Sequence, residues 1–272
     1  MATLSYHEQK NIENTKKLRE LQKELPYFCT DFFRGIEAST SVRTRIAYAH
    51  DLKIFFQFLK TANPRTFDNP AHTLTPGDLE KLTVSDLEEY IDYLKCHPSD
   101  TCEDVVNTER GLMRKVSSLR SFYSYFFRNE LIEKNPAALV RMPKLHEKEI
   151  IRLEIDEVAK LLDEVEEGDK LTEKQKLYHE RTKVRDLAMM SLLLGTGIRV
   201  SECVGLNIND IDLDTCGARV YRKGGKESVI YFSDEVRDVL EDYLDEREMI
   251  DAVPGNEDAL FLSMQRKRIN VR

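Results

Sequence analysis

Apolar residues recur with a helical period along the first half of this 272-residue chain, and that period restricts the first half to helices. The segment SVRTRIAYAHDLKIFFQFLK carries its large apolar side chains at Tyr48, Leu52, Phe55, Phe56 and Leu59. This spacing of i, i+4, i+7, i+8 and i+11 places them on one face of an amphipathic helix, where they form core. A second helix is predicted in KLTVSDLEEYIDYLKCH, with Thr83 or Ser85 as its N-cap.

The segment RGLMRKVSSLRSFYSYFFR predicts a third helix with two different faces, and it contains no acidic residue. Its apolar stripe consists of Val116, Leu119, Tyr123 and Phe126. The opposite side carries Arg110, Arg114, Ser117, Ser121 and Arg128. One face can therefore pack while the other contacts phosphates, although a solvated basic face explains this helix alone equally well.

The charge of the whole chain argues at first against a nucleic-acid partner, because the formal net charge is -8 and the pI is about 5.4. The distribution reverses that impression, since the acidic residues crowd into EIDEVAKLLDEVEEGDKLTEK and SDEVRDVLEDYLDEREMIDAVPGNED. We therefore predict that duplex DNA binds the basic face and the SVRTR segment. The candidate contacts are Arg43, Thr44, Arg45, Arg110, Arg114, Ser117 and Arg120.

The second half changes character after a connector with two prolines and mixed charge, which places a domain boundary near Met142 to Ile151. LEIDEVAKLLDEV predicts a helix, a charged loop is expected through Lys176, and TKVRDLAMMSLLLGTG predicts a helix central to a second core. The short runs ARVYR and ESVIYF, joined by KGGK, predict a β-hairpin with Lys223 and Lys226 at its tip.

The stretch TGIRVSECVGL places Arg199 where the hydrophobic pattern leads the chain inside. An arginine cannot be neutralised, so its burial is costly unless a carboxylate or another anion meets it. Glu202, three residues on, can orient Arg199 in an ordinary intrahelical pair. Alternatively, a turn beside a new helix beginning at Val200 would offer the guanidinium to a phosphate.

Several classes of protein and site are disfavoured. The five cysteines show no CxxC pattern and are expected to be free thiols. Cys96, His97 and Cys102 lack the spacing of a zinc site, so no metal is expected. No apolar run approaches a membrane span and the N-terminus has no apolar signal region, so we expect a soluble cytoplasmic protein without a membrane partner.

TGIRVSECVGLNINDID followed by RKGGKESVIYF resembles the active-site region of the tyrosine recombinases, the phage-integrase and Xer-like family. The resemblance extends over roughly residues 25 to 265. It implies a mainly helical chain with a small β-hairpin or sheet: an N-terminal extension at 1–24, a helical SAM-like core-binding domain at 25–141, a linker at 142–152, and the first part of an α+β catalytic domain at 153–272. It also implies a clamp on double-stranded DNA and self-association into a tetramer on DNA.

The family's chemistry is transesterification through a covalent 3′-phosphotyrosyl intermediate without a metal, ATP or other cofactor. By this resemblance Arg199 holds the scissile phosphate, Glu202 supports it, and Lys223 protonates the leaving 5′ oxygen. Lys226 is the alternative lysine if the hairpin register differs.

This sequence departs from the family because no His-x-x-Arg motif and no following tyrosine are found. We expect a truncated catalytic domain that binds DNA without cleaving it. The two main hypotheses are part of a DNA-cleaving recombinase and a non-catalytic DNA-binding protein derived from one. A helical protein-interaction module is the third.

Overall fold

The computed structural model describes residues 5–62, 74–98, 104–146, 149, 151–222 and 225–271. The chain divides into two compact units, Met1–Glu149 and Ile150–Arg272, called unit 1 and unit 2 below. Each unit has its own hydrophobic core. The division falls within the connector that the sequence places between the two halves.

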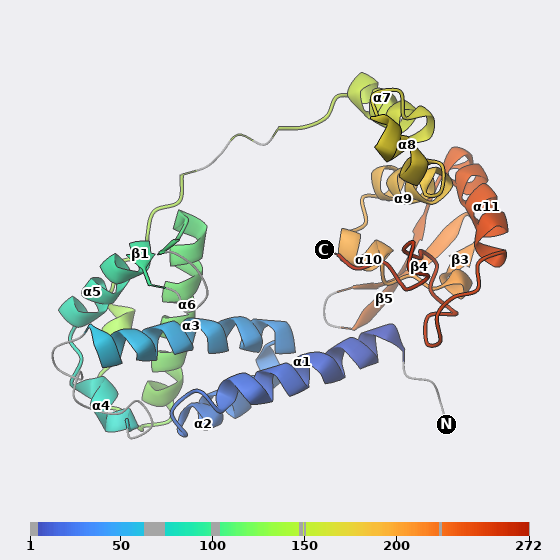
Figure 1. Cartoon of the computed structure of the whole chain (residues 1–272). Coiled ribbons are helices and arrows are strands. Elements are labelled where there is room, and N and C mark those ends of the chain that lie inside the picture. Colours follow the sequence, from blue (N-terminus) through green and yellow to red (C-terminus); the bar gives the residue numbers. More distant parts are fainter. Residues whose placement is uncertain are drawn as a thin grey trace. The chain divides into compact units, whose positions relative to one another are not determined.

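Unit 1 is built from helices (Figure 1). They are α1 (Tyr6–Gln22), α2 (Cys29–Gly35), the 3-10 helix η1 (Glu37–Ser39), α3 (Val42–Thr61), α4 (Pro76–Glu80), α5 (Val84–Lys95), α6 (Glu109–Arg128) and η3 (Pro136–Ala138). A two-stranded antiparallel ribbon, β1 (Cys96–His97) with β2 (Val105–Val106), precedes α6.

Aromatic rings fill the core of unit 1. The predicted stripes on α3 and α6 are buried, except that Tyr48 is partly buried against the core. Thr83 caps α5 through a hydrogen bond from the amide of Asp86. Phe122 is fully buried on α6, and its ring lies 4.9 to 6.0 Å from those of Phe28, Phe32, Phe56 and Phe126. The contacts with Phe32, Phe56 and Phe126 are edge-on, and such contacts add to the stabilisation that burial alone provides. The period of the sequence therefore predicted the core of this unit.

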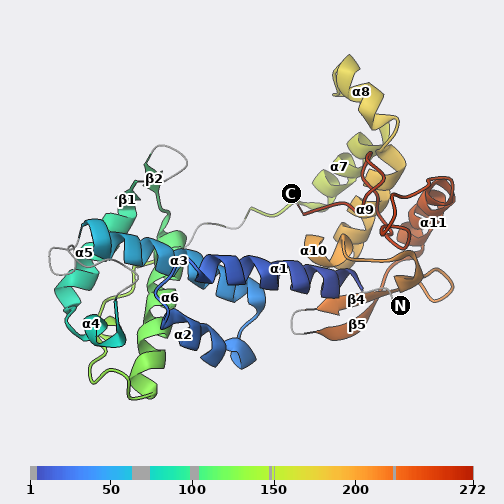
Figure 2. The ribbon, with the colours of Figure 1, turned by 60° about the horizontal axis from the view of Figure 1, so that its bottom comes forward.

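The first residues of the chain, expected only as an extension, form α1. Ser5 caps this helix through a reciprocal pair of hydrogen bonds with Glu8, and Leu18 is buried in the unit 1 core. α1 lies alongside α3 in both views (Figures 1 and 2). The helix is therefore part of unit 1.

Unit 2 combines helices with a three-stranded antiparallel sheet of order β3-β4-β5. Its elements are α7 (Ile155–Glu167), α8 (Glu173–His179), α9 (Lys183–Thr196), α10 (Val200–Cys203), η4 (Ile208–Asp210), β3 (Ile211–Asp212), β4 (Gly217–Arg222), β5 (Lys226–Tyr231) and α11 (Asp234–Glu248). α9 packs against both α7 and α11, which gives it the central position expected from its apolar sequence.

The predicted hairpin is present as β4 and β5, in the register that pairs Arg222 with Lys226. Gly225 adopts a φ of 75°, the left-handed conformation for which a glycine was expected at this turn. Lys223 and Gly224 lie outside the described residues. The chain is thus mainly helical with small antiparallel sheets, as expected.

One segment of unit 2 differs from the prediction. The charged stretch expected as a loop through Lys176 contains α8, because Thr172 and Gln175 form a capping box that starts a helix. The high charge of the segment concealed this local signal. Within the described ranges, no helix combines the length and the apolar character needed to cross a bilayer.

We predict that Phe122→Ala lowers the free energy of unfolding of unit 1 by about 3 to 5 kcal/mol, because it leaves a cavity among four aromatic rings. Chemical denaturation followed by circular dichroism measures this change. Phe127→Ala is the matched control, since the neighbouring ring is 47% exposed and its loss should change stability little. Equal effects of the two substitutions would contradict the packing described here.

Candidate phosphate-binding site and DNA-facing surface

Arg199 stands at the junction of two helices in unit 2. α9 ends at Gly197, whose φ of 65° turns the chain, and Arg199 is the N-cap residue of α10. Its side chain is 72% exposed, so the apolar pattern before it does not carry the guanidinium into the core, and the helix expected from Val200 is present. Ile198 is the residue that the hydrophobic pattern places inside, at 7% exposed. The guanidinium is therefore available to a ligand.

The buried side chain of Glu202 holds Arg199 in position. Nη1 of Arg199 lies 2.8 Å from Oε1 of Glu202, and the backbone N–H of Arg199 donates to Oε2 at 3.0 Å. Burial alone would raise the pKa of Glu202, but these hydrogen bonds and the charges of Arg199 and Arg222 lower it overall. The Glu202 carboxylate already accepts the backbone N–H of Arg199 at the start of α10, so that N–H is not available to a ligand. A bound phosphate would therefore contact the Arg199 guanidinium.

The end of the hairpin adds positive charge: Lys226 was expected there from the sequence, and Arg222 was not. Strand alternation places Arg222 and Lys226 on the face that carries the buried residues Ala218 and Val220, and β4 packs against α10. Arg222 also contributes to the lowered pKa of Glu202. Like charges directly opposite each other in a sheet are destabilising, so an anion placed here would stabilise the hairpin end. Two features of the sequence could have indicated Arg222: it directly precedes KGGK, and strand alternation places it on the same face as Ala218 and Val220.

A second arginine holds the loop that follows α10. The guanidinium of Arg268 donates to the carbonyls of Val204 and Leu206 at 3.1 and 2.6 Å, and to Oδ1 of Asn207 at 2.5 Å. The segment around Arg268 is thereby fixed to the same part of unit 2 as Arg199. No sequence pattern announces these contacts, because their partners are backbone carbonyls far along the chain.

The tyrosines of unit 2 differ in accessibility, and Tyr178 on α8 is 52% exposed. The hydroxyl of Tyr243 donates to the carbonyl of Leu260 at 2.9 Å, and burial raises the pKa of that hydroxyl. Tyr221 lies on β4, and Tyr231 on β5 is 71% exposed. Tyr243 is thus occupied in the core.

The predicted DNA contacts of unit 1 fall into two groups. Arg43 is exposed in the first turn of α3, and Arg110 and Ser117 are exposed on α6. Thr44 lies beside Arg43 and shares a hydrogen bond with the Ser41 hydroxyl. Arg43, Thr44 and Arg110 lie in the first turns of their helices, where the backbone dipoles favour an anion, whereas Ser117 lies near the middle of α6.

The other predicted arginines are engaged within unit 1. Arg45 is buried and lies 2.7 Å from a carboxylate oxygen of Glu37, and Arg120 donates to the carbonyls of Ala137, Ala138 and Val140. These contacts hold η1 and η3 in place. Their role toward DNA stays a prediction.

Arg114 is partly exposed and is also held by a carboxylate within unit 1. Its side chain is 47% exposed, while Nη1 lies 2.6 Å from Oδ2 of the buried Asp51 on α3. Burial raises the pKa of Asp51, although the charges of Arg114 and Lys115 oppose that effect. Lys115 is itself buried, which lowers its pKa, and it donates to Asn107 at 2.6 Å.

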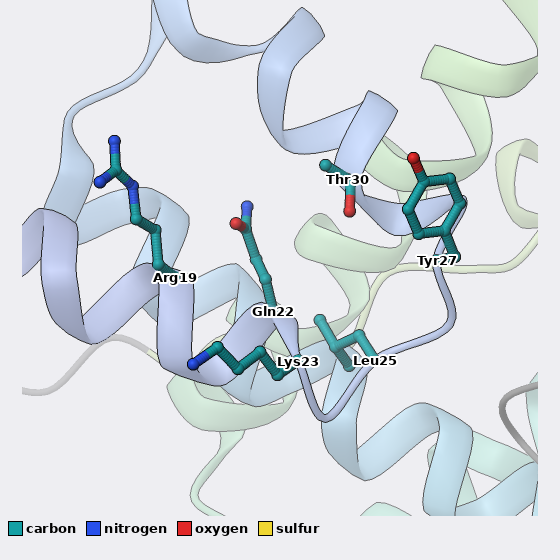
Figure 3. Close-up of a pocket in the computed structure, with 6 residues that line it drawn as sticks. All are labelled: Arg19, Gln22, Lys23, Leu25, Tyr27 and Thr30. Atoms are coloured by element: carbon teal, nitrogen blue, oxygen red, sulfur yellow. The ribbon is translucent and has the colours of Figure 1, made fainter.

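A separate pocket of about 430 Å³ lies between the end of α1 and the start of α2 (Figure 3). Arg19, Gln22, Lys23, Leu25, Tyr27 and Thr30 line it. None of the predicted site residues contributes to this pocket. Its position therefore gives it no part in the surface formed by α3 and α6.

The weak metal pattern of the sequence gains no support in the described part of the chain, where no three potential ligands come together. His97 is buried, and its Nδ1 lies 2.9 Å from the carbonyl of Pro98. Cys102 lies outside the described residues.

Known proteins resemble this chain in sequence. Residues 151–272 match the Phage integrase family. The chain is 34% identical over 249 residues to tyrosine recombinase XerC of Caldanaerobacter subterraneus subsp. tengcongensis, covering 89% of this chain and 64% of the relative. It is 30% identical to tyrosine recombinase XerC of Leptospira interrogans serogroup Icterohaemorrhagiae serovar copenhageni, covering 87% and 66%.

A solved structure supports the same fold. The lambda integrase(75-356) dimer bound to a COC′ core site matches with a TM-score of 0.57 at 17% identity, over 90% of this chain and 74% of that one. The chain therefore shares the fold of that integrase. Residues 151–272 belong to the Phage integrase family, and the chain spans 64% and 66% of the length of the two XerC relatives.

The lowered pKa of Glu202 gives a pH prediction for unit 2. A carboxyl group whose folded pKa lies below its usual value of 4.5 stabilises the fold above that pH, and the contribution is lost as the pH falls through the folded pKa. Glu202→Gln should therefore remove part of the acid-induced loss of stability. Thermal unfolding measured from about pH 7 to about pH 3 tests this. A variant profile as steep as the wild-type profile would refute it.

Proposed function

We propose that this chain forms the DNA-binding and phosphate-holding part of a site-specific tyrosine recombinase, which cleaves and rejoins DNA through a 3′-phosphotyrosyl intermediate. The observation that carries the proposal is the exposed guanidinium of Arg199, anchored on the buried carboxylate of Glu202 and accompanied by Arg222 and Lys226. The membership of residues 151–272 in the Phage integrase family supports it.

The chemistry follows from this geometry. As the scissile phosphate is attacked, negative charge develops on its oxygens, and the Arg199 guanidinium supplies donors fixed in advance by Glu202. A lysine of the hairpin, Lys223 or Lys226, protonates the leaving 5′ oxygen. Neither step requires a metal or another cofactor.

Unit 1 is proposed to hold the duplex. Arg43, Arg110 and Arg114 lie at exposed positions on α3 and α6, which pack against each other. Contacts from such residues to phosphates fix the position of a protein on DNA. The partner is double-stranded DNA, on which we propose that the complete recombinase assembles as a tetramer. We propose that the protein acts in the cytoplasm.

We predict that Arg110→Ala weakens duplex DNA binding and reduces the slope of log affinity against log salt concentration by about 0.9, as expected for one lost phosphate contact. Fluorescence anisotropy across a salt series measures both quantities. Arg34→Ala, which removes an exposed arginine of α2 outside the proposed surface, is the control and should leave both quantities nearly unchanged. Unchanged affinity and slope for Arg110→Ala would remove α6 from the DNA interface.

We predict that Arg199→Ala lowers strand cleavage about a thousandfold, since loss of one donor to a developing anion costs roughly 3 to 4 kcal/mol. DNA binding should remain mostly intact, and Glu202→Ala should have a smaller effect. A suicide-substrate assay, on a chain that contains these residues and a tyrosine nucleophile, measures cleavage. Near-normal covalent complex with Arg199→Ala would refute the assignment.

A DNA-binding protein without cleavage activity is the second candidate, and the tyrosines of unit 2 favour it. Because Tyr243 is buried and hydrogen-bonded, and Tyr221 and Tyr231 lie on the hairpin, we expect these 272 residues to form no covalent complex with nicked DNA. Denaturing electrophoresis detects such an adduct. An adduct mapped to any of these three tyrosines would show that the active site was assigned wrongly.

A further inference from the structure

Arg114 differs from the other basic residues of the proposed DNA-facing surface in how it is held. The side chain of Arg114 is 47% exposed, while the side chain of Asp51, its ion-pair partner, is 1% exposed. Arg45 shows the reverse arrangement, because its own side chain is buried and its partner Glu37 is 63% exposed. No ion pair or hydrogen bond of the Arg43 and Arg110 side chains occurs among the residues that the structure describes.

The carboxylate of Asp51 is buried and contacts Arg114 through Oδ2, whereas its Oδ1 has no hydrogen-bond partner among the described residues. Asp51 belongs to α3 and Arg114 to α6, so their 2.6 Å contact joins the two helices of the proposed surface. Lys115 lies close enough to affect the pKa of Asp51, and it is held in turn by Asn107. Asn107 also donates to the carbonyl of Leu94 at 2.6 Å. The position of the guanidinium is therefore set before any ligand arrives.

A fixed guanidinium suits one kind of DNA contact better than another. A phosphate requires positive charge and tolerates a mobile side chain, whereas a base edge requires donors at defined positions. The contact with Asp51 engages Nη1. It leaves the edge formed by Nε and Nη2, which matches the O6 and N7 acceptors of guanine in the major groove.

We propose that Arg114 is a specificity-determining residue that reads a guanine, and that Asp51 is the positioning residue that aims it. The proposal rests on the proposed function, because it requires unit 1 to bind duplex DNA through α3 and α6. It assigns different tasks to neighbouring arginines of one helix. Arg110 contributes affinity at every sequence, and Arg114 contributes preference at one base pair.

The test is selection from a randomised duplex library, followed by sequencing, with the 272-residue chain. Arg114→Ala should abolish the preference for guanine at one position of each binding site, a loss of roughly 5- to 100-fold in discrimination. Arg114→Lys keeps the charge but not the planar fork, and it should lose the same preference. Asp51→Asn keeps the shape and should weaken that preference, with thermal unfolding confirming that the variant is folded.

Arg110→Ala is the matched control, expected to keep the base preference and to lower affinity uniformly with a smaller salt dependence. Retention of the full guanine preference by Arg114→Ala or Arg114→Lys would overturn the proposal, even if Asp51→Asn failed to fold. Full retention of the preference by folded Asp51→Asn would overturn the role of Asp51. Absence of salt-dependent DNA binding by the wild-type chain would instead remove the proposed function itself, and this inference with it.

Discussion

An arginine cannot give up its charge, and this constraint organises both units of the protein. In each unit a partly exposed guanidinium stands on a buried carboxylate: Arg114 on Asp51 at 2.6 Å, and Arg199 on Glu202 at 2.8 Å. Removing the carboxylates from water is unfavourable, and the paired charges offset that cost only in a defined geometry. The surrounding packing therefore keeps each guanidinium in one place while leaving its outer edge open to a ligand.

The two pairs also show how far the sequence alone could lead. Glu202 follows Arg199 by three residues, so helical spacing was sufficient to predict their contact. Asp51 and Arg114 are 63 positions apart, and neither their contact nor the burial of Asp51 leaves a periodic signal in the sequence. The same division explains the fold: α3, α5, α6, α9 and the hairpin follow from local period and turn residues. α8 follows from a capping box that its charged surroundings concealed.

Counting basic residues along a sequence overestimates the charge available to DNA. Several arginines of this chain are occupied by backbone carbonyls, among them Arg120, Arg185, Arg247 and Arg268. Their five donors in a planar fork suit the ends of helices and irregular loops, where carbonyl groups lack helical partners. The basic face of α6 is therefore smaller in the structure than its sequence indicates, and its remaining members gain importance.

The contacts of Arg268 have a consequence for the order in which the protein folds. Its guanidinium reaches carbonyls 62 and 64 positions earlier in the chain, so this tie forms only after the intervening sheet and α11 have brought the two segments together. Closing a loop of that length carries an entropic penalty that the shorter contacts of unit 2 avoid. The loop after α10 therefore owes its shape to a residue far along the chain, and a change at Arg268 would loosen the segment that follows Arg199.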